Sequence, residues 1–156
     1  MKTKIFSLLA VCFILSSTTI FAQESFTHPE AYITVTLPAG WMYEADETSL
    51  TATTEDETLA FTFSVLNSDD MDAALGAIDD MLNSSFSDIT IGEAVEMDFN
   101  GLYGIFIDGT ADGLECAFAV IDSPVEGLSM IISGWAAPEV IEAYSEDIQL
   151  IKNLDI

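Results

Sequence analysis

Apolar and polar residues alternate along much of the chain, which is the pattern of strands that bury one face. The clearest alternation runs over residues 58–66, where every second side chain is Leu, Phe, Phe or Val. Shorter alternations predict further strands at residues 33–37, 49–54 and 89–99. Because Glu93 interrupts the last of these patterns, we expect that strand to begin at an edge of the sheet.

Three later segments are apolar on both faces, which is typical of strands that are covered on two sides. They are residues 102–107, 116–121 and 128–132. Short turn sequences separate these strands, among them Asn100-Gly101 and Asp112-Gly113. Each covered strand therefore needs a packing layer above and below the sheet.

Two segments carry apolar residues at helical spacing and can supply those layers. Residues 69–83 form the first amphipathic helix, with Ser68 as its expected N-cap. Residues 138–154 form the second, with Pro138 suited to its first turn. The order of elements predicts one α+β domain, an α/β/α sandwich with an antiparallel sheet of about six or seven strands and helices on both faces.

Residues 1–22 have the features of a cleaved secretory signal peptide. Lys2 and Lys4 precede an apolar run, and a polar stretch follows it. The run is about half the length of the roughly 20 residues that a membrane-spanning helix needs. We therefore expect an exported protein, periplasmic or extracellular, whose single domain covers residues 23–156.

The net charge of the chain restricts the classes of partner that it can bind. The expected mature chain keeps Lys152 as its only basic residue against 27 acidic ones, a net charge of −26. Nucleic acids and anionic membranes are excluded as partners, because both require clustered Lys and Arg. A saline habitat would also account for such charge, since salt screens its self-repulsion. Cys116 is the only thiol left, so no intrachain disulfide can form.

Residues 108–113, DGTADG, resemble the first half of a calcium loop. A loop of the EF-hand type needs a bidentate Glu at its twelfth position, where this chain has Ala119, and helices where this chain predicts strands. The segment is therefore predicted to be a hairpin turn. A calcium site of another type, built from Asp108, Asp112 and Glu115, stays open as an alternative.

Catalytic groupings are missing from the sequence. His28 is the only histidine and precedes Pro29 in a segment that we expect to be a flexible arm, which disfavours Ser-His and Cys-His sites. The sequence has no set of residues that matches a zinc site or a glycine-rich nucleotide-binding loop. A small hydrolase that uses paired carboxylates is a third hypothesis, since 27 acids offer many pairs. We predict no catalytic residue and, calcium aside, no cofactor.

Trp41 and Trp135 each follow a glycine near the end of a strand. Such aromatics are typical of core packing, but together with Tyr43 they would form a partner-binding patch with an acidic rim. That patch predicts that Trp41→Ala abolishes partner binding and leaves the fold intact. The acidic residues of 46–57 would join one such surface if their loops meet at one end of the sheet.

The segment AYITVTLPAGWMYEADETSLTATT, followed by FTFSVL, an acidic helix, two long hairpins and AYSEDIQLIKNLDI, resembles the PsbP-like superfamily and exported bacterial DcrB-like proteins. The resemblance spans residues 30–154, and residues 37–41, LPAGW, carry most of it. It implies an α/β/α sandwich that acts in binding or assembly, with some relatives associated with calcium or other metals. It implies no functional residue. We therefore expect a non-catalytic domain that binds a protein partner, with a cation-binding module as the alternative.

Overall fold

The computed structural model describes residues 23–68 and 70–155. The predicted signal peptide, residues 1–22, lies outside the described residues, so its cleavage stays a prediction. No helix in the described ranges is long and apolar enough to cross a membrane.

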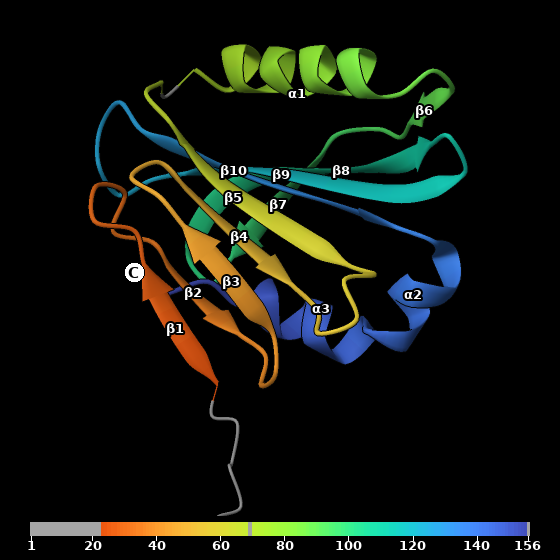
Figure 1. Cartoon of the computed structure of the whole chain (residues 1–156). Coiled ribbons are helices and arrows are strands. Elements are labelled where there is room, and N and C mark those ends of the chain that lie inside the picture. Colours follow the sequence, from red (N-terminus) through yellow and green to blue (C-terminus); the bar gives the residue numbers. More distant parts are fainter. Residues whose placement is uncertain (1–22, 69, 156) are drawn as a thin grey trace, which may run out of the picture.

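The described residues form ten strands and three helices (Figure 1). In chain order they are β1 (Glu24–Thr27), β2 (Thr34–Leu37), β3 (Met42–Ala45), β4 (Ser49–Thr53), β5 (Ala60–Leu66), α1 (Met71–Ser85), β6 (Ile89–Ile91), β7 (Val95–Phe99), β8 (Leu102–Ala111), β9 (Leu114–Asp122), β10 (Ser129–Ala136), α2 (Pro138–Ala143) and α3 (Ser145–Ile151).

Eight strands make one antiparallel sheet in the order β3-β4-β5-β10-β9-β8-β6, and β7 pairs with β8 next to β6. The strands β1 and β2 form a separate antiparallel hairpin. The predicted α+β class with an antiparallel sheet is confirmed. The predicted strand over residues 33–37 lies outside this sheet as β2. The sheet still has eight strands because β3 adds an outer strand and the predicted strand over residues 89–99 is divided in two.

Both faces of the sheet are covered, as the doubly apolar strands predicted. On one face α1 packs over β9, where Phe118 and Val120 join a cluster with Ile78 of the helix. On the other face the hairpin β1–β2 and the helices α2 and α3 lie below the sheet (Figure 1). Their side chains meet Ala119 and Ile121, the alternate residues of β9. The α/β/α sandwich is therefore confirmed.

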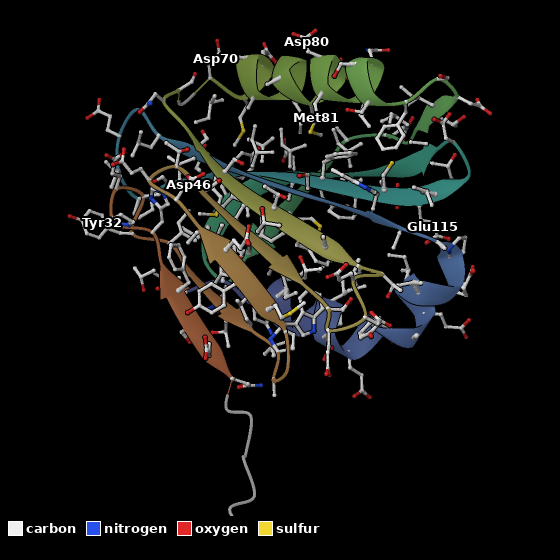
Figure 2. The ribbon with its side chains drawn as sticks, viewed as in Figure 1. Tyr32, Asp46, Asp70, Asp80, Met81 and Glu115 are labelled. Atoms are coloured by element: carbon white, nitrogen blue, oxygen red, sulfur yellow. The ribbon has the colours of Figure 1, made fainter. Side chains whose placement is uncertain are left out.

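The helix α1 follows the predicted pattern, with one change at its start. Its N-cap is Asp70, whose carboxylate accepts hydrogen bonds from the N–H groups of Asp72 and Ala73, rather than Ser68. Asp80 points outward from the helix and Met81 points toward the sheet, as Figure 2 shows. The side of the helix that faces away from the sheet therefore carries acidic side chains.

The predicted helix over residues 138–154 is instead two short helices, α2 and α3. Tyr144 separates them with φ −103° and ψ 20°, values outside the helical region. A second helix then begins at Ser145. The acidic side chains of Glu146 and Asp147 stabilise its first turn, because negative charge favours the positive end of a helix.

The division between β6 and β7 has a steric and a hydrogen-bonding origin. A Cβ atom at Gly92 would lie 2.8 Å from Oδ1 and 3.0 Å from the carbonyl oxygen of Asp108, so a larger residue would require the Asp108 side chain and the adjoining backbone to shift. Its N–H donates to the carbonyl oxygen of Asp108 at 2.8 Å, after which the chain leaves β8 and returns to it as β7.

His28 is not in a flexible arm, contrary to the prediction. It connects β1 to β2, is buried, and its Nδ1 accepts hydrogen bonds from the N–H groups of Glu30 and Ala31 at 3.2 Å each. Its Nε2 has no hydrogen-bond partner among the described residues. The apolar side chains of β2 anchor this hairpin to the core, which the sequence pattern before residue 33 did not reveal.

Candidate functional site

The segment DGTADG is the end of the β8–β9 hairpin, as predicted. Asp112 and Gly113 form its two-residue turn with φ of 51° and 84°, the left-handed values that a type I′ turn requires. The carboxylate of Asp112 accepts hydrogen bonds from the N–H groups of Asp88 at 2.7 Å and Ser87 at 3.2 Å. These hydrogen bonds hold the segment after α1 against this turn.

The two other predicted calcium ligands lie away from that carboxylate. Asp108 in β8 pairs with Ala117, and Glu115 in β9 pairs with Thr110, so both side chains leave the sheet on the face of α2 and α3. Within residues 23–68 and 70–155, no three His, Cys, Asp or Glu side chains come together as a metal-ligand group. A calcium site at Asp108, Asp112 and Glu115 stays an untested prediction.

The acidic loops of residues 46–57 do not meet, because they lie at opposite ends of β4. Each organises its own turn. Hydrogen bonds from the backbone N–H of Thr48 and from Ser49 lower the pKa of Asp46. Hydrogen bonds, chiefly from the hydroxyl groups of Thr58 and Thr54, lower the pKa of Asp56 to about 2.

The three predicted partner-binding aromatics do not form one patch. Trp41 is half-buried; it stacks on Phe61, and its Nε1 donates to Oδ2 of Asp147 at 2.9 Å. Trp135 leaves the opposite face of the sheet and meets Phe86 at a ring separation of 5.9 Å. Tyr43 lies on the outer strand β3 and is exposed. Whether any of the three binds a partner stays a prediction.

A different exposed surface lies at the opposite edge of the sheet, on β7. Val95 is 52% exposed and Met97 is 37% exposed, and both leave β7 on the face of α2 and α3. Glu96 and Asp98 alternate with them on the other face and are exposed. Among the described residues β7 pairs only with β8, so its outer side is unpaired. We call these four residues the β7 edge.

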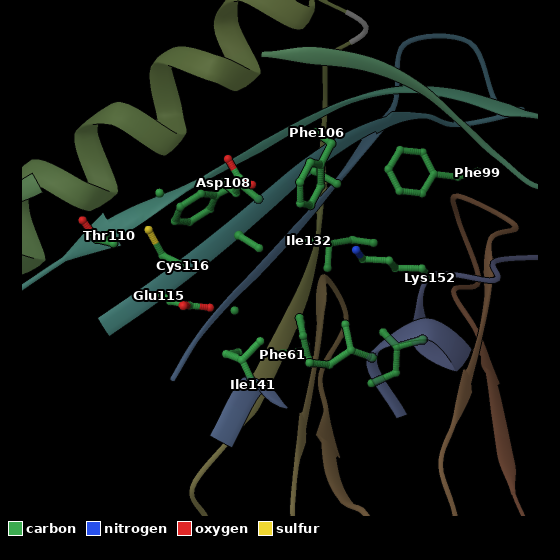
Figure 3. Close-up of a pocket in the computed structure, with 17 residues that line it drawn as sticks. Phe61, Phe99, Phe106, Asp108, Thr110, Glu115, Cys116, Ile132, Ile141 and Lys152 are labelled. Carbon is green, nitrogen blue, oxygen red and sulfur yellow. The ribbon is translucent and has the colours of Figure 1, made fainter. Parts of the chain in front are cut away.

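A pocket of about 440 Å³ lies between the sheet and the helices α2 and α3 (Figure 3). Its walls are apolar for the most part, with Phe61 and Ile132 from the sheet and Ile141 and Ile148 from the helices. The carboxylates of Asp108 and Glu115 mark one end, and Lys152 and Phe99 mark the other. Figure 3 shows the residues at these two ends well separated.

Small residues in the central strands make this space. Ala117 and Ala119 of β9 and Gly134 of β10 are neighbours on the pocket face. A Cβ atom at Gly134 would lie 2.6 Å from the ring of Phe61, so a larger residue would require that ring to move. The helices rest on the large side chains around these positions and leave the centre open.

Lys152 is the only Lys or Arg in the described part of the chain, and it is half-buried. Its Nζ lies 4.8 Å from the centroid of the Phe106 ring, a cation–π contact at the pocket wall. The two carboxylates that line the pocket, those of Asp108 and Glu115, belong to its other end. One end of the pocket is therefore positively charged and the other is negatively charged.

The hydroxyl groups that contact carboxylates, Ser49 on Asp46 at 3.0 Å and Thr58 on Asp56 at 2.7 Å, belong to exposed turns. Both hydrogen bonds to Nδ1 of His28 come from backbone N–H groups, so no hydroxyl or thiol uses it as a base. Cys116 is a free, buried thiol whose pKa is raised by burial and by the charge of Asp108, which disfavours the reactive thiolate.

Sequence reasoning missed the pocket and the surface of β7, although it expected the strand over residues 89–99 to begin at an edge of the sheet, where β6 and β7 lie. Two signals for the pocket were present: small residues within otherwise large apolar strands, at Ala117, Ala119 and Gly134, and the isolated base Lys152. The β7 edge was hidden because residues 89–99 read as one strand.

Comparison with known proteins identifies the fold of the chain but not its activity. No family model matches the chain, and no curated protein matches its sequence. The similarity that exists is in three dimensions, to solved structures of low sequence identity.

Cyanobacterial PsbP (CyanoP) from Synechocystis sp. PCC 6803 superposes with a TM-score of 0.65 at 8% identity, covering 90% of this chain and 95% of that one. The Ran-binding protein Mog1p of Saccharomyces cerevisiae superposes with a TM-score of 0.58 at 11% identity, covering 87% of this chain and 96% of that one. LpqN of Mycobacterium tuberculosis, involved in cell envelope biogenesis, superposes with a TM-score of 0.56 at 11% identity, covering 84% of this chain and 87% of that one. The resemblance found in the sequence is thus confirmed for the fold, and the chain has a PsbP-like α+β fold.

Proposed function

We propose that this protein is an exported, non-catalytic binding domain that takes an extended segment of a protein partner at the β7 edge. The observation that carries the proposal is a strand that pairs on one side only among the described residues, with exposed side chains that are apolar on one face and acidic on the other. Among the described residues, no hydroxyl or thiol hydrogen-bonds to Nδ1 of His28, so the only imidazole of the chain gives no support to a catalytic role.

Strand addition suits this edge for a physical reason. In an antiparallel pair only alternate residues exchange N–H···O=C bonds with the neighbouring strand, so half of the backbone groups of β7 point away from β8. An extended peptide gains affinity from those groups and specificity from the alternate side chains. Val95 and Met97 would contact apolar side chains of the partner, and Glu96 and Asp98 would contact basic ones.

The charge of the chain supports a basic partner. A net charge of −26 after removal of residues 1–22 attracts positively charged segments over a distance of about 8 Å at physiological salt. We therefore expect a partner segment in which basic and apolar residues alternate. The Ran-binding neighbour Mog1p supports a binding role on this fold only by analogy.

Export is part of the proposal, and it rests on the sequence of residues 1–22. N-terminal sequencing of the protein from the extracellular or periplasmic fraction tests it. A mature chain that begins at Gln23 supports export with cleavage. An intact N-terminus in the cytoplasmic fraction would contradict it.

The binding surface is tested by comparing two pairs of variants. Met97→Lys and Glu96→Lys alter the β7 edge, and Met42→Lys and Glu44→Lys make the same changes on β3, the opposite edge of the sheet. All four side chains are exposed, so we expect every variant to fold. The immobilised protein is mixed with the exported fraction of its own cells, and bound proteins are quantified by mass spectrometry.

We expect a specific partner to be lost from the β7 variants at least tenfold and retained by the β3 variants. Because opposite charges contribute to the contact, binding of that partner should also weaken as salt is raised. A partner retained equally by all four variants would contradict binding at β7.

A further inference from the structure

We propose that the pocket beneath the sheet is a binding site for a single-chain amphiphile with one anionic head group, of the long-chain carboxylate class. The site is separate from the β7 edge, and the inference does not depend on the proposed protein partner. The observations that carry it are the shape of the pocket, the nature of its walls and the position of Lys152.

Shape and walls point to an alkyl chain. The volume of about 440 Å³ is within the range of about 300–1,000 Å³ found for small-molecule sites. Phe61, Ile132 and Ile148 face the space from the sheet and the helices, and none of them offers a hydrogen bond. A ligand that covers these walls gains free energy by removing apolar surface from water and needs no polar group along its length.

The head group is indicated by Lys152. An ammonium group at an apolar wall is stabilised most by an anion that it can contact directly. The single Lys of the described residues lines this pocket rather than the acidic outer surface, in a chain with 27 acidic residues. Its Nζ lies against the ring of Phe106, where it is available to a bound molecule (Figure 3).

The opposite end of the pocket sets the direction and the charge of the ligand. Asp108 and Glu115 would repel a second anionic group, which leaves one anion at Lys152 and a tail that runs toward Ile141. A dicarboxylate is therefore excluded, and a monocarboxylate with an uncharged tail fits both ends.

The experiment measures dodecanoate binding to the purified exported protein by isothermal titration calorimetry in 0.15 M NaCl, below the micellar range. Octanoate tests the tail and dodecanol tests the head group. Three variants are compared with the wild type: Lys152→Met, which removes the ammonium group; Ala119→Leu, which fills the pocket; and Asn83→Asp, a matched control. The control also lowers the net charge by one, but on the outer side of α1.

We expect one molecule of dodecanoate per chain, bound more than a hundredfold more tightly than octanoate, because each buried methylene contributes about a fourfold gain. Lys152→Met should weaken dodecanoate binding about tenfold or more and leave dodecanol unchanged. Ala119→Leu should weaken both ligands, and Asn83→Asp should weaken neither. Thermal unfolding shows which variants are folded, and Lys152→Met decides the question if Ala119→Leu is not.

Two results would overturn the inference. One is that dodecanoate does not bind, or binds no better than octanoate. The other is that Lys152→Met binds dodecanoate as tightly as the wild type, since the pocket would then not recognise an anion.

Discussion

Replacing Trp41 by alanine should loosen the C-terminal helices from the sheet, because Trp41 connects the two. Its indole ring stacks on Phe61 of β5 at a centroid separation of 6.2 Å. It also meets Tyr144, between α2 and α3, at 6.3 Å in an edge-to-face arrangement. The hydrogen bond from its Nε1 to Asp147 adds a polar contact to α3 at 2.9 Å.

The expected loss follows from these contacts. Truncating a core Phe or Trp to alanine costs about 3–5 kcal/mol, and the half-buried position of Trp41 puts it at the lower end, about 3 kcal/mol. Trp41→Phe keeps the stacking and loses the hydrogen bond, so it should cost about 1–2 kcal/mol. Both values are large against a total stability of about 5–15 kcal/mol.

Urea unfolding followed by far-ultraviolet circular dichroism measures these losses, because the signal does not depend on the tryptophan that is removed. Trp135→Ala is the control: this ring is more exposed, lies on the other face and contacts Phe86, so its loss should cost about 1 kcal/mol. If Trp41→Ala costs less than Trp135→Ala, Trp41 is not a packing residue, and its role as a partner-binding side chain regains support.

Three further predictions concern the acidic side chains. Asp112→Ala should cost about 1–2 kcal/mol in urea unfolding, because the backbone N–H groups of Ser87 and Asp88 lose their acceptor; Asp112→Asn, which keeps an acceptor oxygen, should recover most of the loss. The pKa of Asp56 is lowered from 3.8 to about 2, so its contribution to stability is present above pH about 4 and is lost as pH falls through about 2. A carbon-detected NMR titration of Asp56 should find this midpoint, and Thr58→Ala should move it toward 3.8. An unchanged midpoint would show that the Thr58 hydroxyl is not the main cause of the lowered pKa. Calcium, magnesium and sodium chlorides at matched ionic strength should raise the thermal midpoint equally by screening, and a shift specific to calcium would instead support a site at Asp108, Asp112 and Glu115.

Most of the sheet could be predicted because some of its strands carry period-two patterns, which indicate one buried face, and others carry doubly apolar patterns, which indicate cover on two sides. Phe118 and Val120 meet α1, and Ala119 and Ile121 meet the opposite layer, as the apolar run in β9 indicated. The hairpin turn at Asp112 was also predictable, since local backbone geometry selects Asp-Gly there.

The breaks in this pattern were not predictable, because contacts distant in sequence decide them. The strand over residues 89–99 divides where Gly92 meets Asp108 of another strand. Trp41 looked equally suited to a surface patch or to the core, and its contacts with Asp147 and Tyr144 come from more than 100 residues later in the chain. The pocket depends in the same way on small residues from different strands lying side by side.

Site-specific photo-crosslinking tests the central claim, that a partner binds at the β7 edge, most directly. A photoreactive amino acid replaces Glu96 in one protein and, as the control, Glu44 on β3 in another, and each is irradiated in cells that produce it. The account predicts an adduct with one partner from position 96 and none with that partner from position 44. An adduct of equal yield from both positions, or none from position 96, would contradict it.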